Sequence, residues 1–437
     1  MDHREVFTLT DQPPSKNVIM PLWTFGFKYD AEGEITKQKA RLVAKEYTQI
    51  PGLDFDQTYA SVARLKSMRM TAAVIACKCL SPWQIDYVAT YLNSDNKFEV
   101  YMEQPWLFVV WGKEHMVLRV NKTVYGMMQG AYNWEDKLSR TYKGLGYYQS
   151  HADPCIQHRL IDGQYTLTCT YTDDVLGGSS SIQEKEKAIG EMEECYKVKR
   201  IEGTGGAKVI LGMAMTQDDK TGAITLSQRI FTECMLECFG MSDCNMKSTP
   251  LPCGIKLLEL NTPRTEDNTL FMKDKPYREA LGCIMWLQAN PGPTHWKALQ
   301  HVLAYVKGTL HYKITYDPNS PDGLNVSGHS DLDNASDPDT MCSTSHMELE
   351  VTGNHRFLYN RGGVHGTEPC LPTSSVDIYG DNKGSVDLAK NVKGITKAKH
   401  IHMKHHYIRE QVNEGDVEVI RIPTESNVTD ILMKPLP

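Results

Sequence analysis

The sequence predicts an α+β fold, because strand-like and helix-like segments are mixed in its first part without regular βαβ alternation. Two hairpins support this prediction. One turns at Asp162-Gly163, a pair that tolerates the positive φ angles of a tight turn, and the other covers residues 209–228. The third observation is a strand-rich block that begins near residue 311 and runs to the end of the sequence. We therefore expect a mixed region of sheets and helices, followed by a block dominated by strands.

The elements before the first hairpin alternate in type. A strand, a turn at Glu32-Gly33 and a second strand are expected over residues 23–49. Residues 71–80 have helical character, a short strand is expected at 83–86, and a helix is expected over 87–92.

Beyond the first hairpin, helices predominate. Residues 181–198 predict an amphipathic helix, and its inner side is expected to consist of Ile182, Ile189, Met192 and Tyr196. Helices are also expected over residues 229–241, 279–289 and 294–308. The stretch 249–267 contains Pro and Gly at intervals, which is typical of a linker.

The composition is that of a globular protein. With 437 residues and 41 % hydrophobic content, the chain is long enough for two or three domains with their own cores. The net charge of −7 argues against a surface coated for nonspecific nucleic-acid binding, but it allows a locally basic channel. Twelve cysteines without a CxxC pair favour reduced thiols in a cytosolic or nuclear protein. No apolar run approaches the roughly 18 residues that span a bilayer, and the polar N-terminus is unlike a signal peptide, so no membrane association is expected.

Two adjacent aspartates end the strand-like stretch YTLTCTYTDDVLGG of residues 165–178. Strand alternation would place Asp173 on the apolar, buried face of this strand and Asp174 on the other face. An Asp-Asp pair in a turn is also common without any function, because Asp caps its own backbone there. A third carboxylate, Asp86, ends another short strand-like run, which favours a functional interpretation.

Three converging carboxylates would repel one another unless a divalent cation lay between them. Mg²⁺, or Mn²⁺ in its place, takes oxygen ligands and keeps positions for phosphate and water. Two such ions about 3.5–4 Å apart would stabilise an attacking hydroxyl and a leaving phosphate. The three aspartates therefore predict metal-dependent nucleotidyl transfer.

The same stretch carries a family resemblance. TYTDDVL resembles the Tyr-x-Asp-Asp box of reverse transcriptases, and neighbouring stretches resemble blocks of the copia type of retrotransposon polymerase, in the right order. These stretches include KARLVAKEYTQIPGLDFDQTYASVARLKSMRM, QIDYVATYLN, FEVYMEQP and VYGMMQGAYNW. The resemblance implies an RNA-directed DNA polymerase that uses an RNA template, a DNA primer, dNTPs and Mg²⁺.

The resemblance also implies an architecture. Residues 1–250 would form a right-hand polymerase with fingers, a ferredoxin-like palm and a short thumb. Residues 251–310 would be connecting helices, and residues 311–437 would form an α/β ribonuclease H-like domain. The gag, protease and integrase parts of such a polyprotein are expected to lie elsewhere and are absent from this chain.

Individual residues receive roles from the same resemblance. Asp86 and Asp173 would be the main metal ligands, and Asp174 would complete the catalytic set. Lys39 and Arg41 would hold the incoming triphosphate, for which the Arg fork is suited. Without the flanking blocks, these two cations would indicate a solvated strand edge.

Two further residues would contact the nucleotide. Gln129 would lie against its sugar. Tyr91 would lie under the sugar 2′ position and exclude ribonucleotides by its bulk; the alternative is an ordinary core tyrosine.

The last part of the chain resembles the ribonuclease H domain that follows the polymerase in these elements, where carboxylates on two metals cut RNA in a hybrid. Asp331, Asp381 and Asp430 would be its first, third and fourth acids. The second acid, normally a Glu on a helix, is not found. Glu368 is the remnant candidate, in a shortened segment with two prolines that disfavour a helix. We therefore expect this domain to be truncated and its RNA cleavage to be impaired.

A histidine cluster near the end suggests zinc, because HxH and HxxxH spacings can bind it. The cluster consists of His400, His402, His405 and His406. The surrounding KHIHMKHHYIRE instead resembles the family's Lys-His-Ile block, for which no structural zinc is implied.

Departures from the family pattern leave another function open. The family's Gln-Ala-Pro is Gln129-Gly130-Ala131 here, and part of the connection is missing after residue 290. The alternative is a decayed or domesticated remnant that binds nucleic acid without catalysis.

Overall fold

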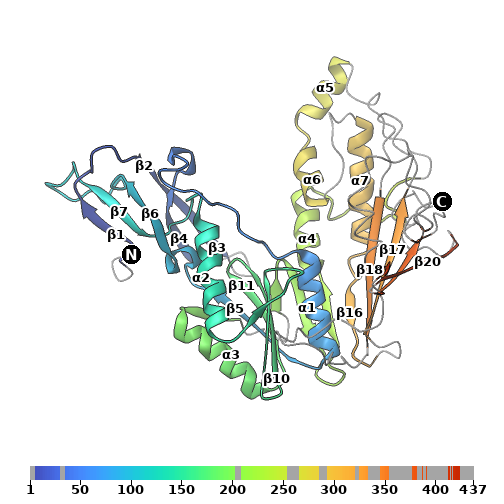
Figure 1. The fold of residues 1–437 in the computed structure, drawn as a ribbon. Helices are drawn as coiled ribbons and strands as arrows, with labels where there is room; N and C mark the ends of the chain where they lie inside the picture. The colour runs from blue at the N-terminus through green and yellow to red at the C-terminus, as the bar shows by residue number, and fades with distance from the viewer. Residues whose placement is uncertain are drawn as a thin grey trace. The chain divides into compact units, whose positions relative to one another are not determined.

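The computed structural model describes most of residues 5–319 and parts of the remainder. The described residues are 5–29, 35–201, 208–252, 265–284, 293–319, 324–332, 345–353 and 376–380, with 386, 390, 412–413, 415 and 417–423. The chain divides into two compact units, Met1–Ile75 with Leu80–Glu202 and Ala76–Cys79 with Gly203–Pro437. Both units contain helices and strands, so the mixed α/β content expected from the sequence is confirmed (Figure 1).

The centre of the first unit is a six-stranded antiparallel sheet in the order β12-β5-β11-β10-β9-β8. Its strands are β5 (Ser81–Tyr87), β8 (Tyr148–Gln149), β9 (Ile156–Ile161), β10 (Gln164–Tyr171), β11 (Asp174–Ser179) and β12 (Val198–Arg200). The β9–β10 turn has φ angles of 50° at Asp162 and 76° at Gly163, which confirms the predicted tight turn.

Helices cover both faces of this sheet. They are α1 (Leu65–Cys77), α2 (Gly130–Gly144) and α3 (Ile182–Cys195). The alternating β5 residues Trp83, Ile85 and Tyr87 pack in one core with α2 and α3, and each is at most 1 % exposed. Burial of such large side chains stabilises the fold by about 1.5–3 kcal/mol each. Because side chains alternate along a strand, Asp86 projects from the opposite face of β5.

The predicted inner side of α3 is largely correct. Ile189 and Met192 are buried, and so is Tyr196, which follows the helix. Ile182 is 67 % exposed, so its placement on the inner side is wrong. It is the first residue of the helix, and the buried stripe begins two residues later at Glu184.

Two adjacent glycines allow close packing on both faces of β11. A Cβ atom on Gly177 would lie 2.2 Å from the Trp83 ring, and one on Gly178 would lie 2.5 Å from Ile75 of α1. Helix α1 therefore packs against the face opposite to α2 and α3, as Figure 1 also shows. This close packing on both faces explains why glycine occupies positions 177 and 178, shortly after the two aspartates.

A smaller sheet and a two-stranded ribbon complete the first unit. The sheet order is β1-β7-β6-β2, and β3 pairs with β4. Their bounds are β1 (Phe7–Thr10), β2 (Val18–Ile19), β3 (Pro21–Tyr29), β4 (Ile35–Ala44), β6 (Asp95–Met102) and β7 (Val117–Lys122). The β3–β4 pair confirms the first predicted strand pair, although its turn lies outside the described residues. Leu42 and Ala44, near the end of β4, are buried in the core of the smaller sheet and anchor the ribbon there.

The second unit begins with an antiparallel sheet in the order β13-β14-β15-β16. Its strands are β13 (Lys208–Ile210), β14 (Met213–Gln217), β15 (Ile224–Ser227) and β16 (Ile314–Tyr316). The β14–β15 pair confirms the second predicted hairpin. The sequence predicted that a strand near residue 311 would begin the final strand-rich block. Strand β16 instead pairs with β15 and belongs to the first sheet of the unit.

Helices follow in the described residues of this unit up to 308. They are α4 (Arg229–Cys238), α5 (Glu266–Lys273), α6 (Tyr277–Ile284) and α7 (Pro293–Gly308). Trp296 and Leu303 of α7 are buried in two apolar clusters that also include residues of the other helices. Residues 253–264 of the predicted linker and 285–289 of the predicted helix lie outside the described residues.

The final sheet has the order β18-β17-β19-β20. Its strands are β17 (Leu324–Leu332), β18 (Ser345–Gly353), β19 (Val376–Gly380) and β20 (Val417–Arg421). The β17–β18 pair is antiparallel, whereas β17–β19 and β19–β20 are parallel. Within the described part of the chain, every helix is too short or too polar to cross a bilayer.

Candidate active site

Two of the predicted carboxylates lie directly opposite each other on neighbouring strands. Asp86, near the end of β5, is the register partner of Asp174, the first residue of β11. Opposite residues of an antiparallel pair project from the same face, with Cβ atoms about 4.5–5.5 Å apart. Both side chains are half-buried. The fold therefore brings these two acids together.

Asp173 lies in the turn between β10 and β11. The turn consists of Thr172 and Asp173, which makes Tyr171 the partner of Asp174 and ends the strand alternation before Asp173. The expectation that Asp173 lies on the buried face of a strand is therefore wrong, and its side chain is exposed. Its carbonyl accepts the N–H of Tyr87 at 2.9 Å, which attaches the turn to the end of β5.

Burial, together with the neighbouring acids, raises the pKa of Asp174. Burial is the largest cause, followed by the charges of Asp173 and Asp86, and together they raise the pKa from 3.8 to about 6. The folded state therefore binds this proton more tightly than the unfolded chain does. The contribution of this carboxyl to the free energy of unfolding is fully present below pH 3.8 and is lost as the pH rises through about 6. At neutral pH, the site carries negative charge that a bound cation would relieve.

Asp86, Asp173 and Asp174, here called the carboxylate corner, supply the oxygen donors that Mg²⁺ prefers. Besides burial, the charges of Asp173 and Asp86 raise the pKa of Asp174, and a bound cation would reduce this repulsion, so the three acids are chemically suited to hold one. In the described residues, no three His, Cys, Asp or Glu side chains are already gathered as a metal-binding cluster. Because Asp173 is on the turn, binding of a cation would have to draw it towards the other two.

Tyr91 and Tyr125 form an aromatic wall next to the corner. Tyr91 lies on the short 3-10 helix η3 (Thr90–Asn93), where the sequence predicted a helix over 87–92. The two rings meet edge to face, with centroids 4.9 Å apart. Burial raises the pKa of both phenols, and the charge of Asp173 raises each further. Both rings are thus within electrostatic reach of the corner.

Arg41 joins this wall from the β3–β4 ribbon. Its guanidinium carbon lies 5.4 Å from the centroid of the Tyr125 ring, a cation–π contact. Arg41 opposes the effect of burial on the pKa of Tyr125. Arg41, one of the two predicted triphosphate residues, therefore contacts the ring that packs against Tyr91, the predicted sugar contact.

Lys39 lies on the same face of the ribbon as Arg41, two residues earlier on β4. Their partners on β3, Gly26 and Thr24, are small, and the same face also carries Lys37 on one side and Val43 with Leu22 on the other. Arg41 is exposed, and Lys39 is half-buried. The basic pattern of the sequence therefore corresponds to one face of an exposed strand pair.

Gln129 occupies a buried position before α2, with 2 % exposure. Its side-chain amide donates to the carbonyl of Asp54 at 3.1 Å and to Asn96 at 3.3 Å, and its oxygen accepts from Gln49 at 3.0 Å. These bonds direct the side chain towards residues 49–54. A contact between Gln129 and a nucleotide sugar would require some of them to be exchanged.

Trp134 and Tyr125 are functional candidates that sequence reasoning missed. The indole Nε1 of Trp134, on α2, donates to the carbonyl of Thr172 at 2.8 Å, immediately before Asp173. Both aromatic residues occur in the quoted stretch VYGMMQGAYNW, but neither periodicity nor charge links them to the aspartates. Only the folded arrangement shows that they approach the corner.

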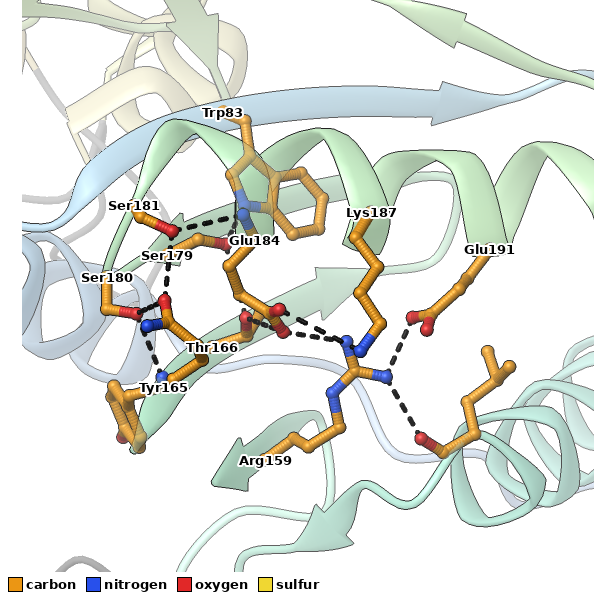
Figure 2. A network of polar contacts seen from close by, with 12 residues as sticks. Trp83, Arg159, Tyr165, Thr166, Ser179, Ser180, Ser181, Glu184, Lys187 and Glu191 are labelled. Atoms are coloured by element: carbon orange, nitrogen blue, oxygen red, sulfur yellow. Dashed lines mark hydrogen bonds and ion pairs between the residues drawn. The ribbon is translucent and has the colours of Figure 1, made fainter. Parts of the chain in front are cut away.

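A buried ion network joins strand β9 of the six-stranded sheet to two helices, as Figure 2 shows. Arg159 of β9 is 1 % exposed. Its Nη2 donates to Glu184 at 2.8 Å, and its Nη1 donates to Glu191 at 2.7 Å and to the carbonyl of Leu145 at 3.0 Å. The guanidinium also lies over the Tyr147 ring at 4.4 Å. The network joins β9 to α3 and to the end of α2.

One of the predicted ribonuclease H acids lies in the described part of the chain. Asp331 is on β17, and the preceding Ser330 is the register partner of Gly380 on the parallel strand β19. The other three candidates, Asp381, Asp430 and Glu368, lie outside the described residues, as does the histidine cluster at 400–406.

Comparisons with known proteins give a family match that covers nearly all of the first unit and the beginning of the second. Residues 4–253 match the family model described as "Reverse transcriptase (RNA-dependent DNA polymerase)". The chain is also similar to the "Retrovirus-related Pol polyprotein from transposon TNT 1-94" of Nicotiana tabacum, with 28 % identity over 99 % of this chain and 35 % of the relative. The corresponding polyprotein from transposon RE2 of Arabidopsis thaliana is 26 % identical over 97 % of this chain and 31 % of the relative.

The chain thus spans about a third of the length of these curated relatives. A solved foamy viral protease-reverse transcriptase in complex with an RNA/DNA hybrid aligns over 98 % of this chain and 52 % of that chain, with a TM-score of 0.41 and 12 % identity. The family model covers more than half of the chain, and similar Pol polyproteins cover nearly all of it. The chain therefore belongs to the reverse transcriptase (RNA-dependent DNA polymerase) family, within the copia-type retrotransposon Pol polyproteins.

Proposed function

We propose that this chain extends a DNA primer on an RNA template by two-metal nucleotidyl transfer. The observation that carries the proposal is the register pairing of Asp86 with Asp174, with Asp173 in the adjoining turn. Burial and the charges of Asp173 and Asp86 raise the pKa of Asp174, and a bound divalent cation would offset this effect beyond what Lys199, the register partner of Asp86 on β12, can supply. Family membership supports the reaction class.

The chain's own residues would bind and orient the substrates. Asp86, Asp173 and Asp174 would hold Mg²⁺, or Mn²⁺ in its place, whose positive charge stabilises the attacking 3′-hydroxyl and the leaving pyrophosphate. Arg41 and Lys39, on the basic face of the ribbon, would bind the triphosphate of the incoming dNTP.

Nucleotide selection would occur at the aromatic wall. Tyr91 is held against Tyr125, so its ring cannot easily withdraw. A ribonucleotide 2′-hydroxyl would meet this ring, whereas a deoxyribonucleotide would not. Arg41, stacked on Tyr125, would bring the triphosphate to the same wall.

The architecture then follows the right-hand plan. The six-stranded sheet with α2 and α3 would be the palm, the β3–β4 ribbon with the smaller sheet the fingers, and β13 to α7 a short thumb with its connection. The final sheet would be a truncated ribonuclease H-like domain. We propose that it cleaves RNA weakly or not at all, because the sequence lacks a clear second acid.

Primer extension by the full chain tests the proposal. The assay uses a DNA primer on an RNA template with four dNTPs and MgCl₂, and it compares Asp173→Asn with Asp162→Asn. These aspartates occupy the two turns at opposite ends of β10, and Asn tolerates the positive φ of position 162. We expect extension by the wild type and by Asp162→Asn, and a loss of at least about a hundredfold in Asp173→Asn. No extension by folded wild-type protein, or equal extension by Asp173→Asn, would contradict the proposal.

A further inference from the structure

The turn that carries Asp173 has an unusual backbone. Thr172 has a φ angle of 55°, in the left-handed region that β-branched residues rarely adopt. Such a conformation persists only where surrounding groups hold it. The Tyr171–Asp174 pair closes the two-residue turn, a geometry that favours a positive φ at its first position, and two further hydrogen bonds reach the turn from outside the hairpin.

Trp134 is placed to hold this turn. Its indole N–H donates to the Thr172 carbonyl at 2.8 Å, and the side chain is 2 % exposed. Its ring packs edge to face against Tyr87 at 5.1 Å and against Tyr196 at 5.3 Å. The donor is therefore fixed by a buried aromatic cluster.

A second bond holds the next peptide group. The N–H of Tyr87 donates to the carbonyl of Asp173 at 2.9 Å. The peptide groups on both sides of the Asp173 Cα atom are thus fixed, one by Trp134 and one by the residue that follows Asp86. Because Tyr87 also contacts the Trp134 ring, the two bonds belong to one assembly.

We propose that Trp134 is a positioning residue that sets the location of the Asp173 carboxylate relative to Asp86 and Asp174 through its indole N–H. The effect of Trp134 on kcat rests on the proposed polymerase function, whereas its anchoring of the turn does not. Since a displacement of about 1 Å in a catalytic group can lower a rate about a hundredfold, loss of one of two anchors should lower kcat while leaving substrate binding intact.

The test compares Trp134→Phe with Tyr196→Phe. Trp134→Phe removes the N–H but keeps an aromatic ring. Tyr196→Phe removes a hydrogen bond of 2.5 Å to Thr141 in the same cluster and leaves the turn untouched. Both variants lose one part-buried hydrogen bond. Trp134→Phe also loses ring volume, so benzothienylalanine at position 134, which keeps the shape of the indole and lacks the N–H, is the matched variant that separates the hydrogen bond from packing.

For Trp134→Phe we expect kcat for first-nucleotide addition to fall about tenfold with an unchanged KM for dNTP. That is equivalent to about 1.4 kcal/mol. The Tyr87 amide, followed by hydrogen exchange, should exchange about tenfold faster in the same variant. Tyr196→Phe should change neither quantity. If Trp134→Phe does not fold, benzothienylalanine at position 134 replaces the N–H with sulfur in a similar shape and gives the same comparison.

Wild-type kcat and wild-type Tyr87 exchange in Trp134→Phe would overturn the proposal, as would equal effects in Tyr196→Phe. The exchange readout does not require activity. If the wild type did not polymerise, the proposed function would fail, yet faster Tyr87 exchange in Trp134→Phe alone would still support the anchor, and unchanged exchange would refute it.

Discussion

Two arginines that bind helix α3 differ in burial but have similar ion-pair geometry. Arg159 lies 2.8 Å from Glu184 and 2.7 Å from Glu191, and its side chain is 2 % exposed. Arg200 lies 2.6 Å from Glu186 and 2.8 Å from Glu193, and its side chain is 35 % exposed. We predict that Arg159→Met destabilises the six-stranded sheet far more than Arg200→Met does.

The magnitude follows from what each substitution leaves behind. Arg159→Met removes the close cationic partner of the Glu184 carboxylate, which is 6 % exposed, and leaves it the longer 4.0 Å contact with the exposed Lys187. Breaking a buried pair in this way costs about 3–5 kcal/mol. Glu191 is 20 % exposed and reaches water more easily, so it should add less. Arg200→Met breaks exposed pairs and should cost about 0–1 kcal/mol.

Native-state hydrogen exchange of β9 and β10 amides is the appropriate assay, because it reports the free energy of opening this sheet separately from the second unit. The double variant Arg159→Met/Glu184→Gln should regain at least about 1 kcal/mol relative to Arg159→Met, since no unpaired buried charge remains at position 184. Equal losses in Arg159→Met and Arg200→Met would refute the reasoning, because burial would then not decide the contribution of these pairs.

Three further predictions concern charge, packing and nucleotide selection. Without divalent cations, Asp174→Asn should be more stable than the wild type by about 1 kcal/mol at pH 7.5, after discounting for solvent screening, because it removes a carboxylate whose pKa is raised to about 6. Urea denaturation should show this difference disappearing near pH 4, and a pH-independent difference would contradict the assignment. Gly177→Ala should lower stability by about 1–3 kcal/mol, since its Cβ would lie 2.2 Å from the Trp83 ring. The control Gly190→Ala, with open space around its Cβ, should raise stability by about 0.5–1 kcal/mol in the same thermal melts. Tyr91→Ala should increase ribonucleotide relative to deoxyribonucleotide incorporation at least about tenfold, and an unchanged ratio would argue against a wall at the 2′ position.

Local signals in the sequence predicted local structure well. The Asp162-Gly163 pair specifies positive φ angles by itself, so its turn could be located without any tertiary information. Short patterns also predict the strand that carries Asp86 near its end and the ribbon that carries Lys39 and Arg41.

Nonlocal pairing accounts for the errors. Asp173 was assigned to a strand because alternation was continued through a two-residue turn, and only the register with β11 shows where the strand ends. Strand β16 was assigned to the final block, yet it pairs with β15, which lies far earlier in the sequence. The bond from Trp134 to the Thr172 carbonyl has no sequence pattern at all, because a backbone acceptor leaves no residue-type signal.

The central claim is that the carboxylate corner supports cation-dependent DNA synthesis on RNA. Its most direct test is the single-turnover rate of first-nucleotide addition, measured against Mg²⁺ concentration for the wild type and for Asp86→Asn, the variant that removes the acid opposite Asp174. We predict a rate that rises to saturation with Mg²⁺ and falls at least about a hundredfold in folded Asp86→Asn. A rate that is independent of divalent cation, or equal in wild type and Asp86→Asn, would contradict the account.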